Sequence, residues 1–322
     1  MAIIRIERAV YGVEDLAECT RFFEDFGLDP VRKTDASVEL ATRTGQVVEL
    51  RPLDDPTLPA GVEPGSTIRE IVWGVESQAD LDRLHAELSR DREVTVDGDG
   101  VLHTVDETGY GIGFAVAAPQ DSQAADAQAP DSQPPDSQPT DRPVNKHGDV
   151  QRWNTPIDPF GRVRPLRLCH VALNIPQEGR DRATGFYLDR LGFRATDVVK
   201  PMGTFMRAEG DSDQHTMLLC HRPDRAGLNH TAYEVRDFDE VVLGANHMIE
   251  QGWREARKLG RHTVGSNVFR FVHAPCGGRV EYAADMDRAD DSFETRVHET
   301  TPPHHIWTLQ TNRDNDREGD PA

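Results

Sequence analysis

The stretch LRLCHVALNIP, residues 166–176, decides the fold of this chain. It is a mostly apolar run of strand length. Apolar residues at helical spacing follow in 180–193, where a glycine supplies the stop signal. Two short apolar runs, 204–210 and 215–221, then have the composition of strands. This order of a strand, a helix and further strands predicts a βαβββ module.

The same order returns in the next hundred residues. Residues 229–235 form a predicted strand, and 237–253 form a predicted helix with Asp237 as its candidate N-cap. Residues 268–275 and 278–285 then predict a closing hairpin. The C-terminal half therefore contains two predicted modules of one kind.

The N-terminal half repeats this pattern. The corresponding pairs are 4–16 with 166–176, 17–28 with 182–193, 69–88 with 229–248, and 108–117 with 276–285. Internal repeats determine an architecture more strongly than any single residue. We expect an α+β fold of four βαβββ modules, paired into two open β-barrel domains whose inward positions face a shared cavity.

One compositional break separates the halves. Residues 119–143 are dominated by Pro, Gln, Ser and Asp, and the tripeptide DSQ occurs three times. Such a segment has too little apolar surface to offset the entropy of ordering, which predicts a flexible linker. The predicted divisions are an N-terminal domain without metal, a disordered linker, a catalytic domain and a tail, over residues 1–118, 119–150, 151–290 and 291–322.

Composition narrows the class of protein. The net charge of -20 argues against binding to nucleic acid or to anionic lipid. The four cysteines have no CxxC spacing, which favours reduced thiols. We find no signal peptide at the start and no apolar run long enough to span a membrane. A cytoplasmic protein with no nucleic-acid or membrane partner is expected.

Three side chains suggest a metal site. His170, His230 and Glu281 each lie near the end of an apolar, strand-like run. Two imidazoles and one carboxylate are the ligand set of mononuclear non-haem Fe(II), although Zn(II) or Mn(II) can use the same ligands. The repeat in the N-terminal half lacks this set. Its residues at the matching positions are Arg8, Glu70 and Gly113.

Glu281 is the most telling of the three. A lone histidine such as His170 in an apolar strand is more often a core residue than a ligand. Glu281, however, lies between Val280 and Tyr282, so strand alternation puts it on the opposite face from both. If that face points into the barrel, a buried carboxylate requires a cation, because an unpaired buried charge is strongly disfavoured.

The C-terminal half resembles the type I extradiol ring-cleavage dioxygenases of the vicinal oxygen chelate superfamily. The specific motifs occur in that family's order and spacing, and the layout covers nearly the whole chain apart from the linker and tail. They are CHVALNIP, FMRAEGDSDQHTMLL, GLNHTAYEV, LGRHTVGSNVFRF and GGRVEYAADMD. The resemblance implies two β-domains of paired modules, with iron only in the C-terminal one, and it implies self-association.

The resemblance also implies roles for residues outside the metal set. His215 corresponds to the acid/base histidine beside the O2 site, and His262 to a histidine that contacts the substrate hydroxyl. Phe271 stands where the family usually has a tyrosine that hydrogen-bonds the catecholate, so the identity of the substrate is open. Phe205 and Asn174 are further candidates for lining the substrate pocket.

Two more histidines, His304 and His305, stand in the segment TPPHHIW near the C-terminus. A position over the cavity mouth is conceivable, but a pair at the protein surface is favoured, and the residues after Trp307 are polar.

The sequence therefore predicts an Fe(II)-dependent dioxygenase that cleaves a catechol-type aromatic diol with O2 to a hydroxymuconate semialdehyde-type product. His215 and His262 are its expected catalytic residues. Two rival classes stay open. One is another metalloenzyme of this fold, such as a glyoxalase-type isomerase or a hydroquinone-cleaving dioxygenase. The other is a module that binds a small molecule without catalysis.

Overall fold

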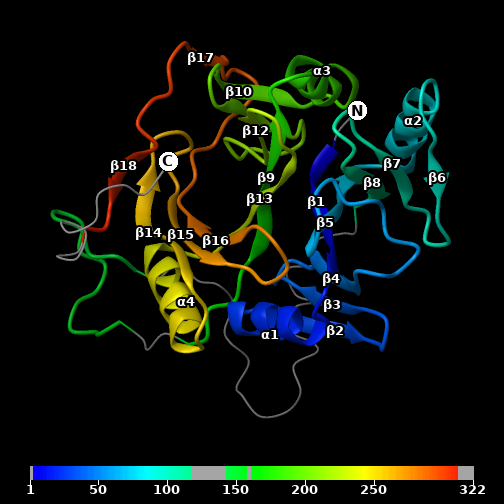
Figure 1. Cartoon of the computed structure of the whole chain (residues 1–322). Coiled ribbons are helices and arrows are strands. Elements are labelled where there is room, and N and C mark those ends of the chain that lie inside the picture. The colour runs from blue at the N-terminus through cyan, green and yellow to red at the C-terminus, as the bar shows by residue number, and fades with distance from the viewer. Residues whose placement is uncertain (1–2, 118–142, 158–160, 311–322) are drawn as a thin grey trace.

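The computed structural model of the protein describes residues 3–117, 143–157 and 161–310. Two β-sheets lie side by side and form the frame of the described chain (Figure 1). Most of the predicted linker, 118–142, and the end of the chain, 311–322, lie outside the described residues.

The N-terminal sheet has eight strands in the order β2-β3-β4-β1-β5-β8-β7-β6. Two helices accompany it, α1 (Leu16–Phe26) and α2 (Gln78–Leu88). The strands are β1 (Ile3–Val13), β2 (Asp29–Lys33), β3 (Val38–Ala41), β4 (Val47–Pro52), β5 (Thr67–Val75), β6 (Thr95–Val96), β7 (Leu102–Val105) and β8 (Gly111–Val116).

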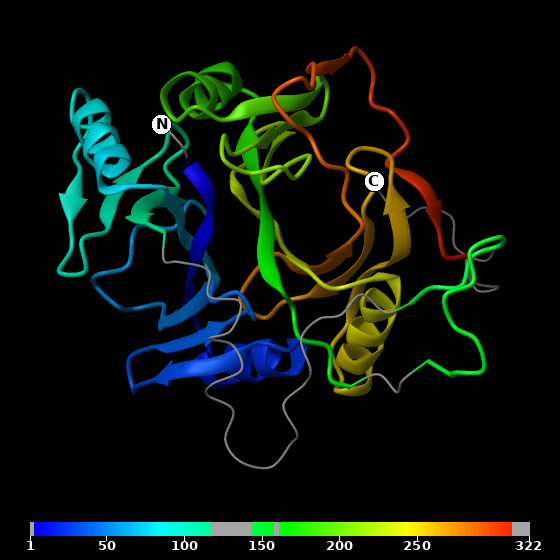
Figure 2. The same cartoon turned by 180° about the vertical axis from the view of Figure 1, so that it is seen from behind.

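The C-terminal sheet has ten strands in the order β17-β10-β11-β12-β9-β13-β16-β15-β14-β18, and it curls around an interior (Figures 1 and 2). Its helical segments are α3 (Arg180–Gly185), the π-helical turn η2 (Phe186–Arg190) and α4 (Phe238–Glu250). The strands are β9 (Arg167–Pro176), β10 (Arg194–Val199), β11 (Gly203–Arg207), β12 (Met217–Arg222), β13 (Gly227–Glu234), β14 (Glu255–His262), β15 (Val268–His273), β16 (Arg279–Ala284), β17 (Arg296–His298) and β18 (His305–Thr308).

The backbone register gives the same repeat as the sequence. In the N-terminal sheet β5 lies between β1 and β8, and Val72 pairs with Arg8 on one side and Gly113 on the other. In the C-terminal sheet β13 lies between β9 and β16, and Ala232 pairs with His170 and with Glu281. The predicted α+β fold of paired modules is confirmed, with both sheets open at their outer strands.

Helix ends follow the local sequence signals. Asp237 caps α4 as predicted, because its side chain accepts a hydrogen bond from the backbone N–H of Glu240. Gly27 ends α1 in the left-handed conformation, at a φ of 109°, which a residue with a Cβ adopts less readily. The helical segment predicted over 180–193 is shorter in the structure. There α3 continues directly into η2, and η2 ends at Arg190.

Four strands of the C-terminal sheet were not predicted, namely β10, β14, β17 and β18. β14 reads EARKLGRH and buries only Leu259 and Gly260, so its sequence shows no apolar face. β10 buries Thr196 and Asp197, whose polarity also hides the strand pattern. These strands are held by pairing with neighbours rather than by their own composition.

The two halves share one continuous apolar core, which includes residues of both sheets. Phe26 of α1 stacks on Tyr282 of β16, with ring centroids 3.9 Å apart, and the Tyr282 hydroxyl donates to the Phe26 carbonyl. The Tyr110 hydroxyl donates to the Asn174 carbonyl at 2.6 Å and accepts from the Gly227 N–H at 2.6 Å. The N-terminal half thereby holds the strands that carry the candidate site. In the described part of the chain, no helix is long and apolar enough to cross a membrane.

Candidate metal centre

Three neighbouring strands bring the predicted ligands together. His170 on β9, His230 on β13 and Glu281 on β16 have ligand atoms that all lie within 4.8 Å of one another. The two Nε2 atoms are 3.1 Å apart, and each is 3.3 Å from Oε2 of Glu281. Within the described ranges, these residues form the one group of three or more potential ligands. The three atoms surround a single point, as ligands of one ion do.

Burial sets the protonation of this group. Glu281 has no solvent exposure, and burial raises the pKa of its carboxyl from 4.5 to about 7. Burial lowers the pKa of His170 to about 3, and burial together with His170 holds the pKa of His230 well below 6.5. At neutral pH both imidazoles are therefore neutral, which is the form that binds a metal.

One oxygen of Glu281 lacks a hydrogen bond. Oε1 accepts from Asn267 Nδ2 at 3.0 Å, whereas the buried Oε2 has no hydrogen-bond donor among the described residues. Oε2 is also the atom that faces both histidine Nε2 atoms. A buried acceptor without a partner is costly, and a divalent cation among these three atoms would satisfy it. The residues present therefore fit a metal ion.

A chain of amides orients His230. Its Nδ1 donates to Asn229 Oδ1 at 2.9 Å, which directs Nε2 toward Glu281. Asn229 Nδ2 donates to Asn174 Oδ1 at 3.0 Å, and Arg222 Nε donates to the same oxygen at 2.8 Å. Arg279 also donates to Asn229 Oδ1. Such partners fix the tautomer and the ring orientation of a ligating histidine.

His215 lies beside the three ligands. It precedes β12, is 4 % exposed, and its ring centroid is 4.4 Å from that of His170. Its Nδ1 donates to Gln214 Oε1 at 2.6 Å, which leaves Nε2 as the basic atom. Burial and the nearby His170 hold its pKa well below 6.5. The edge of Phe205 packs on the His215 ring at 5.1 Å between centroids.

His262 ends β14 on the other side of Glu281. Its Nε2 is 3.9 Å from Glu281 Oε1, and its ring stacks on Phe269 at 3.9 Å between centroids. Its Nδ1 donates to the carbonyl oxygen of His304 at 3.3 Å. Burial lowers the pKa of His262, so this imidazole is also neutral at pH 7. His305 pairs with His262 across the β14–β18 ladder.

Phe271 lies beside the candidate ligands. It pairs directly with Glu281 between β15 and β16, and its ring packs edge-on to His230 at 5.0 Å between centroids. The ring centroid of His262 is 6.2 Å away. Phe271 therefore contributes an apolar edge beside the metal ligands and no hydroxyl.

Two of the sequence interpretations gain detail in the structure. Asn174 holds Arg222 and Asn229, so its side-chain oxygen is already engaged within the protein. His304 is exposed and His305 half-buried, in keeping with the expected surface pair, and the segment that carries them also joins β14 and contacts His262 through the His304 carbonyl.

The sequence analysis missed Gln214, Asn229 and Asn267, each of which bonds a member of the site. Asn229 is instructive because adjacent strand residues normally point to opposite faces. The β9–β13 register shifts between Leu228 and His230, so a local irregularity lets neighbours meet. No pattern in the sequence predicts such a shift in strand register.

At the matching place in the N-terminal half, charged side chains pair with one another. Arg8 forms an ion pair with Glu49 at 2.7 Å, and Glu70 Oε1 contacts His103 Nδ1 at 2.8 Å. That hydrogen bond with Glu70 raises the pKa of His103 to about 9. Gly113 provides no side chain. This half therefore has charge pairs where the other half has the three candidate ligands His170, His230 and Glu281.

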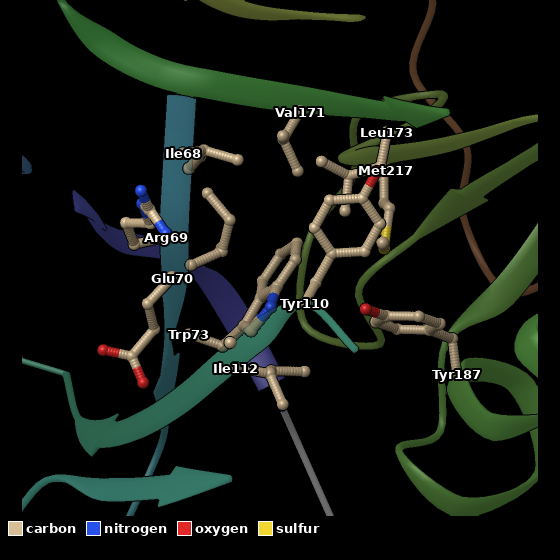
Figure 3. A pocket seen from close by; sticks show the side chains of 12 residues that line it. Ile68, Arg69, Glu70, Trp73, Tyr110, Ile112, Val171, Leu173, Tyr187 and Met217 are labelled. Carbon is tan, nitrogen blue, oxygen red and sulfur yellow. The ribbon is translucent and has the colours of Figure 1, made fainter. Parts of the chain in front are cut away.

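A pocket between the two halves is separate from this centre. Glu70, Trp73 and Tyr110 approach it from the N-terminal sheet, and Leu173 and Tyr187 from the other side (Figure 3). It contains no residue of the His170 group and belongs to the junction of the halves.

Fold and site together give two curled β-sheets, with a buried His-His-Glu group on the second sheet. The comparisons with known proteins agree. Residues 167–282 match the family described as the Glyoxalase/Bleomycin resistance protein/Dioxygenase superfamily, so this segment confirms the resemblance that the sequence suggested.

The relatives found by sequence match part of the chain, whereas the solved structures match nearly all of it. Metapyrocatechase 2 of Cupriavidus necator is 40 % identical over 126 residues, which cover 39 % of this chain and 38 % of that protein. A Mn(II)-bound glyoxalase from Novosphingobium aromaticivorans has a TM-score of 0.71 at 21 % identity, covering 100 % of this chain and 96 % of the other. A halotolerant catechol dioxygenase has a TM-score of 0.70 at 16 % identity, covering 98 % and 96 %. The chain spans less than half the length of the curated relatives it matches, and the structural likeness concerns the fold.

Proposed function

We propose that this protein is an Fe(II)-dependent extradiol dioxygenase that opens a catechol-type ring beside its two hydroxyls, using O2. The observation that carries the proposal is the buried, unpartnered Oε2 of Glu281 facing two neutral imidazole nitrogens. Two relatives are named as a metapyrocatechase and a biphenyl-2,3-diol 1,2-dioxygenase, and these names support ring cleavage by O2 as the reaction class.

His170, His230 and Glu281 would hold the ion. Their single negative charge suits a divalent metal that must also accept an anionic diol. When bound, ferrous iron would supply a Lewis-acidic, redox-active centre at which the two substrate oxygens and O2 meet. Ligand type does not by itself exclude Mn(II).

His215 and His262 handle protons in this proposal. His215 is neutral and its Nδ1–H is already donated, so Nε2 can accept a proton from the diol and return it during ring opening. His262 has the same arrangement, with Nδ1–H held by the His304 carbonyl and Nε2 left to accept from a substrate hydroxyl. Phe271 contributes an apolar contact where a hydroxyl donor would otherwise stand.

The test is oxygen uptake by protein loaded anaerobically with Fe(II), Mn(II) or Zn(II) and supplied with substituted catechols. We expect uptake of one O2 per diol, and incorporation of both atoms of labelled O2 into an open-chain product. Isomerisation of a hemithioacetal without oxygen uptake would instead indicate a glyoxalase-type enzyme. Tight diol binding without turnover by any metal form would indicate a binding module.

A further inference from the structure

Two polar side chains of β10 contact Gln214, the residue that holds His215. Gln214 Nε2 donates to Asp197 Oδ2 at 2.7 Å and to Thr196 Oγ1 at 3.1 Å. At the other end of the same amide, Oε1 accepts from His215 Nδ1 at 2.6 Å. All four residues are buried. One amide group therefore connects a buried carboxylate to the imidazole of His215.

A bulge in β10 lets two neighbouring residues reach the same amide. Adjacent strand residues normally point to opposite faces of a sheet. In the β10–β11 ladder, Ala195 pairs with Met206 and Asp197 pairs with Phe205, so Thr196 is the extra residue of a bulge. Bulges re-aim side chains in this way. The local backbone thus supplies two acceptors to one amide nitrogen.

The orientation of the Gln214 amide follows from these partners. A carboxylate offers acceptors only, so it must face the Nε2 end of the amide. Thr196 Oγ1 donates its own proton to the Phe205 carbonyl at 3.2 Å, which leaves this oxygen as an acceptor for Gln214. Both contacts direct Nε2 toward β10 and Oε1 toward His215. An amide turned the other way would place Oε1 against the carboxylate, with no proton between two acceptors.

The amide in turn decides which nitrogen of His215 carries the proton. Gln214 Oε1 is an acceptor, so the Nδ1 that faces it is protonated and Nε2 keeps its lone pair. The reversed amide would donate to Nδ1 and move the proton to Nε2. Nε2 is the atom that the proposed reaction uses as a proton acceptor. The carboxylate of Asp197 thereby selects the tautomer of a histidine to which it is joined only through Gln214.

The edge strand β17 holds this carboxylate in place (Figure 1). Asp197 pairs with Arg296 in the parallel β10–β17 ladder. Arg296 donates to Asp197 Oδ2 at 2.6 Å, and His298 Nε2 donates to Oδ1 at 2.6 Å. A buried carboxylate without partners is costly, and these two donors offset that cost. Strand β17 therefore belongs to the support of His215.

We propose that Asp197 is a positioning residue for His215 and acts through Gln214. Arg296 and His298 keep its carboxylate in place. The inference rests on the proposed function, in which His215 Nε2 accepts a proton from the diol. Asp197 takes no part in the chemistry. Its effect is to keep one tautomer of His215 populated.

The test is a double-mutant cycle in which nitrogen NMR of isotope-labelled histidine rings reports the tautomer. The protein is loaded with diamagnetic Zn(II), which can use the same ligands as Fe(II). The signals of His215 are assigned by their absence from the spectrum of His215→Gln. In the parent protein we expect a single tautomer of this ring, with the proton on Nδ1.

Each single variant of the cycle should keep this tautomer. In Asp197→Asn, Arg296 still requires an acceptor, so the oxygen of the new amide stays toward Arg296 and Gln214. Its nitrogen then faces His298, whose Nε2 can accept. In Arg296→Met, the carboxylate still faces the amide of Gln214.

The double variant of Asp197→Asn with Arg296→Met should lose the single tautomer. The new amide then has no cation to fix its direction, so it and the Gln214 amide can turn together. Both tautomers of His215 should appear. In the Fe(II)-loaded enzyme, kcat should fall about two- to fivefold beyond the product of the two single effects, with KM within about twofold of the parent. A merely structural ion pair would be lost in the single variants already and would show no such excess.

Asp197→Leu is a second route to the same result, because it removes the carboxylate and offers Gln214 no acceptor. Glu299→Gln is the matched control. It removes the ion pair of Lys200 with Glu299 beside the same two strands and should leave the spectrum of His215 unchanged. A single Nδ1–H tautomer in the double variant, or in Asp197→Leu should the double variant not fold, would overturn the inference. Two tautomers in Glu299→Gln would also overturn it, since loosening of β17 would then suffice.

The spectra separate this inference from the proposed function. They require no diol and can also be recorded on the metal-free protein, so the tautomer is measured whether or not a catechol is turned over. Turnover of catechols with one tautomer in every variant would remove the positioning role and leave the dioxygenase. Two tautomers in the double variant without oxygen uptake by the parent would support the positioning role and contradict the dioxygenase.

Discussion

Glu281 is expected to have opposite effects on the stability of the fold in the presence and in the absence of a metal. Glu281 is buried, one of its oxygens has no hydrogen bond, and burial raises its pKa to about 7. It is therefore a weak point of the metal-free fold. The same burial makes it a strong ligand, because no water competes for Oε2. His215 differs in being held by Gln214 rather than by the three ligands, so its role can be separated from metal binding.

Replacing Glu281 should stabilise the metal-free protein and abolish metal binding. On Glu281, the folded protein keeps a proton that the unfolded chain has lost between pH 4.5 and about 7, so the contribution of this carboxyl to metal-free stability falls as pH rises through that window. The penalty from this group at pH 8 is on the order of 3 kcal/mol. Metal-free Glu281→Gln should therefore gain stability relative to the parent between pH 5 and pH 8, as followed by urea unfolding.

Glu250→Gln, an exposed change on α4, is the control for that experiment and should behave as the parent protein does. Parallel pH profiles for the metal-free parent and Glu281→Gln would contradict the assignment of a buried, proton-holding carboxyl. Added Fe(II) should raise the stability of the parent and of the control, and leave Glu281→Gln unchanged.

His215→Gln should lower kcat by about 10²- to 10⁴-fold, the usual contribution of a general acid-base group. Metal content should stay at the parent level, because His215 is not among the three converging ligands. Oxygen-uptake rates and iron analysis on the same preparation check both halves of the prediction. His273→Gln, a half-buried histidine at the end of β15, is the matched control. Undiminished turnover in the His215→Gln variant would contradict the proposed role of His215 in proton transfer.

At the scale of elements, the side chains of the candidate site come from several neighbouring strands. The repeated order β1-β5-β8 and β9-β13-β16 was predictable, because apolar runs and the repeat revealed it. The three ligands were predictable for the same reason, since each interrupts an apolar run on a central strand. The partners on outer strands were not predictable. β14 contributes His262 from a sequence with almost no apolar residues, and Asn229 meets His230 only through a shift in register.

Asn229→Ala should weaken metal binding about 10- to 100-fold, because loss of a partner that orients a ligating histidine has effects of this size. Asn229→Asp keeps an acceptor for His230 Nδ1 and should recover part of the affinity. Competition of Fe(II) or Zn(II) binding against a chelating dye measures both. Asn246→Ala, which removes an exposed asparagine bonded to Arg270, serves as the control. Unchanged affinity in Asn229→Ala would mean that packing alone orients the ring.

At the scale of the molecule, the N-terminal half is a support for the site. It lacks the ligand triad, yet Tyr110 fixes Asn174 and Gly227, and Glu63 Oε1 accepts from the Leu228 N–H at 2.7 Å. Those contacts hold the start of β13, two residues before His230. The repeat could be predicted from sequence, whereas these bonds between halves could not, because they depend on how two curled sheets face each other.

Tyr110→Phe should destabilise the whole chain by about 1–3 kcal/mol, since it leaves a buried carbonyl and a buried N–H without their partner. Because the halves share one core, we expect a single unfolding transition, shifted as a unit, when intrinsic fluorescence and far-ultraviolet circular dichroism are followed in urea. Two separated transitions in the parent protein would show that the halves unfold independently.

The carbonyl that steadies His262 comes from His304, in the segment that leads into β18. In order of synthesis, the three candidate ligands therefore precede the segment that fixes the His262 ring. A chain that ended before residue 304 would carry all three ligands and lack the carbonyl that holds His262 Nδ1.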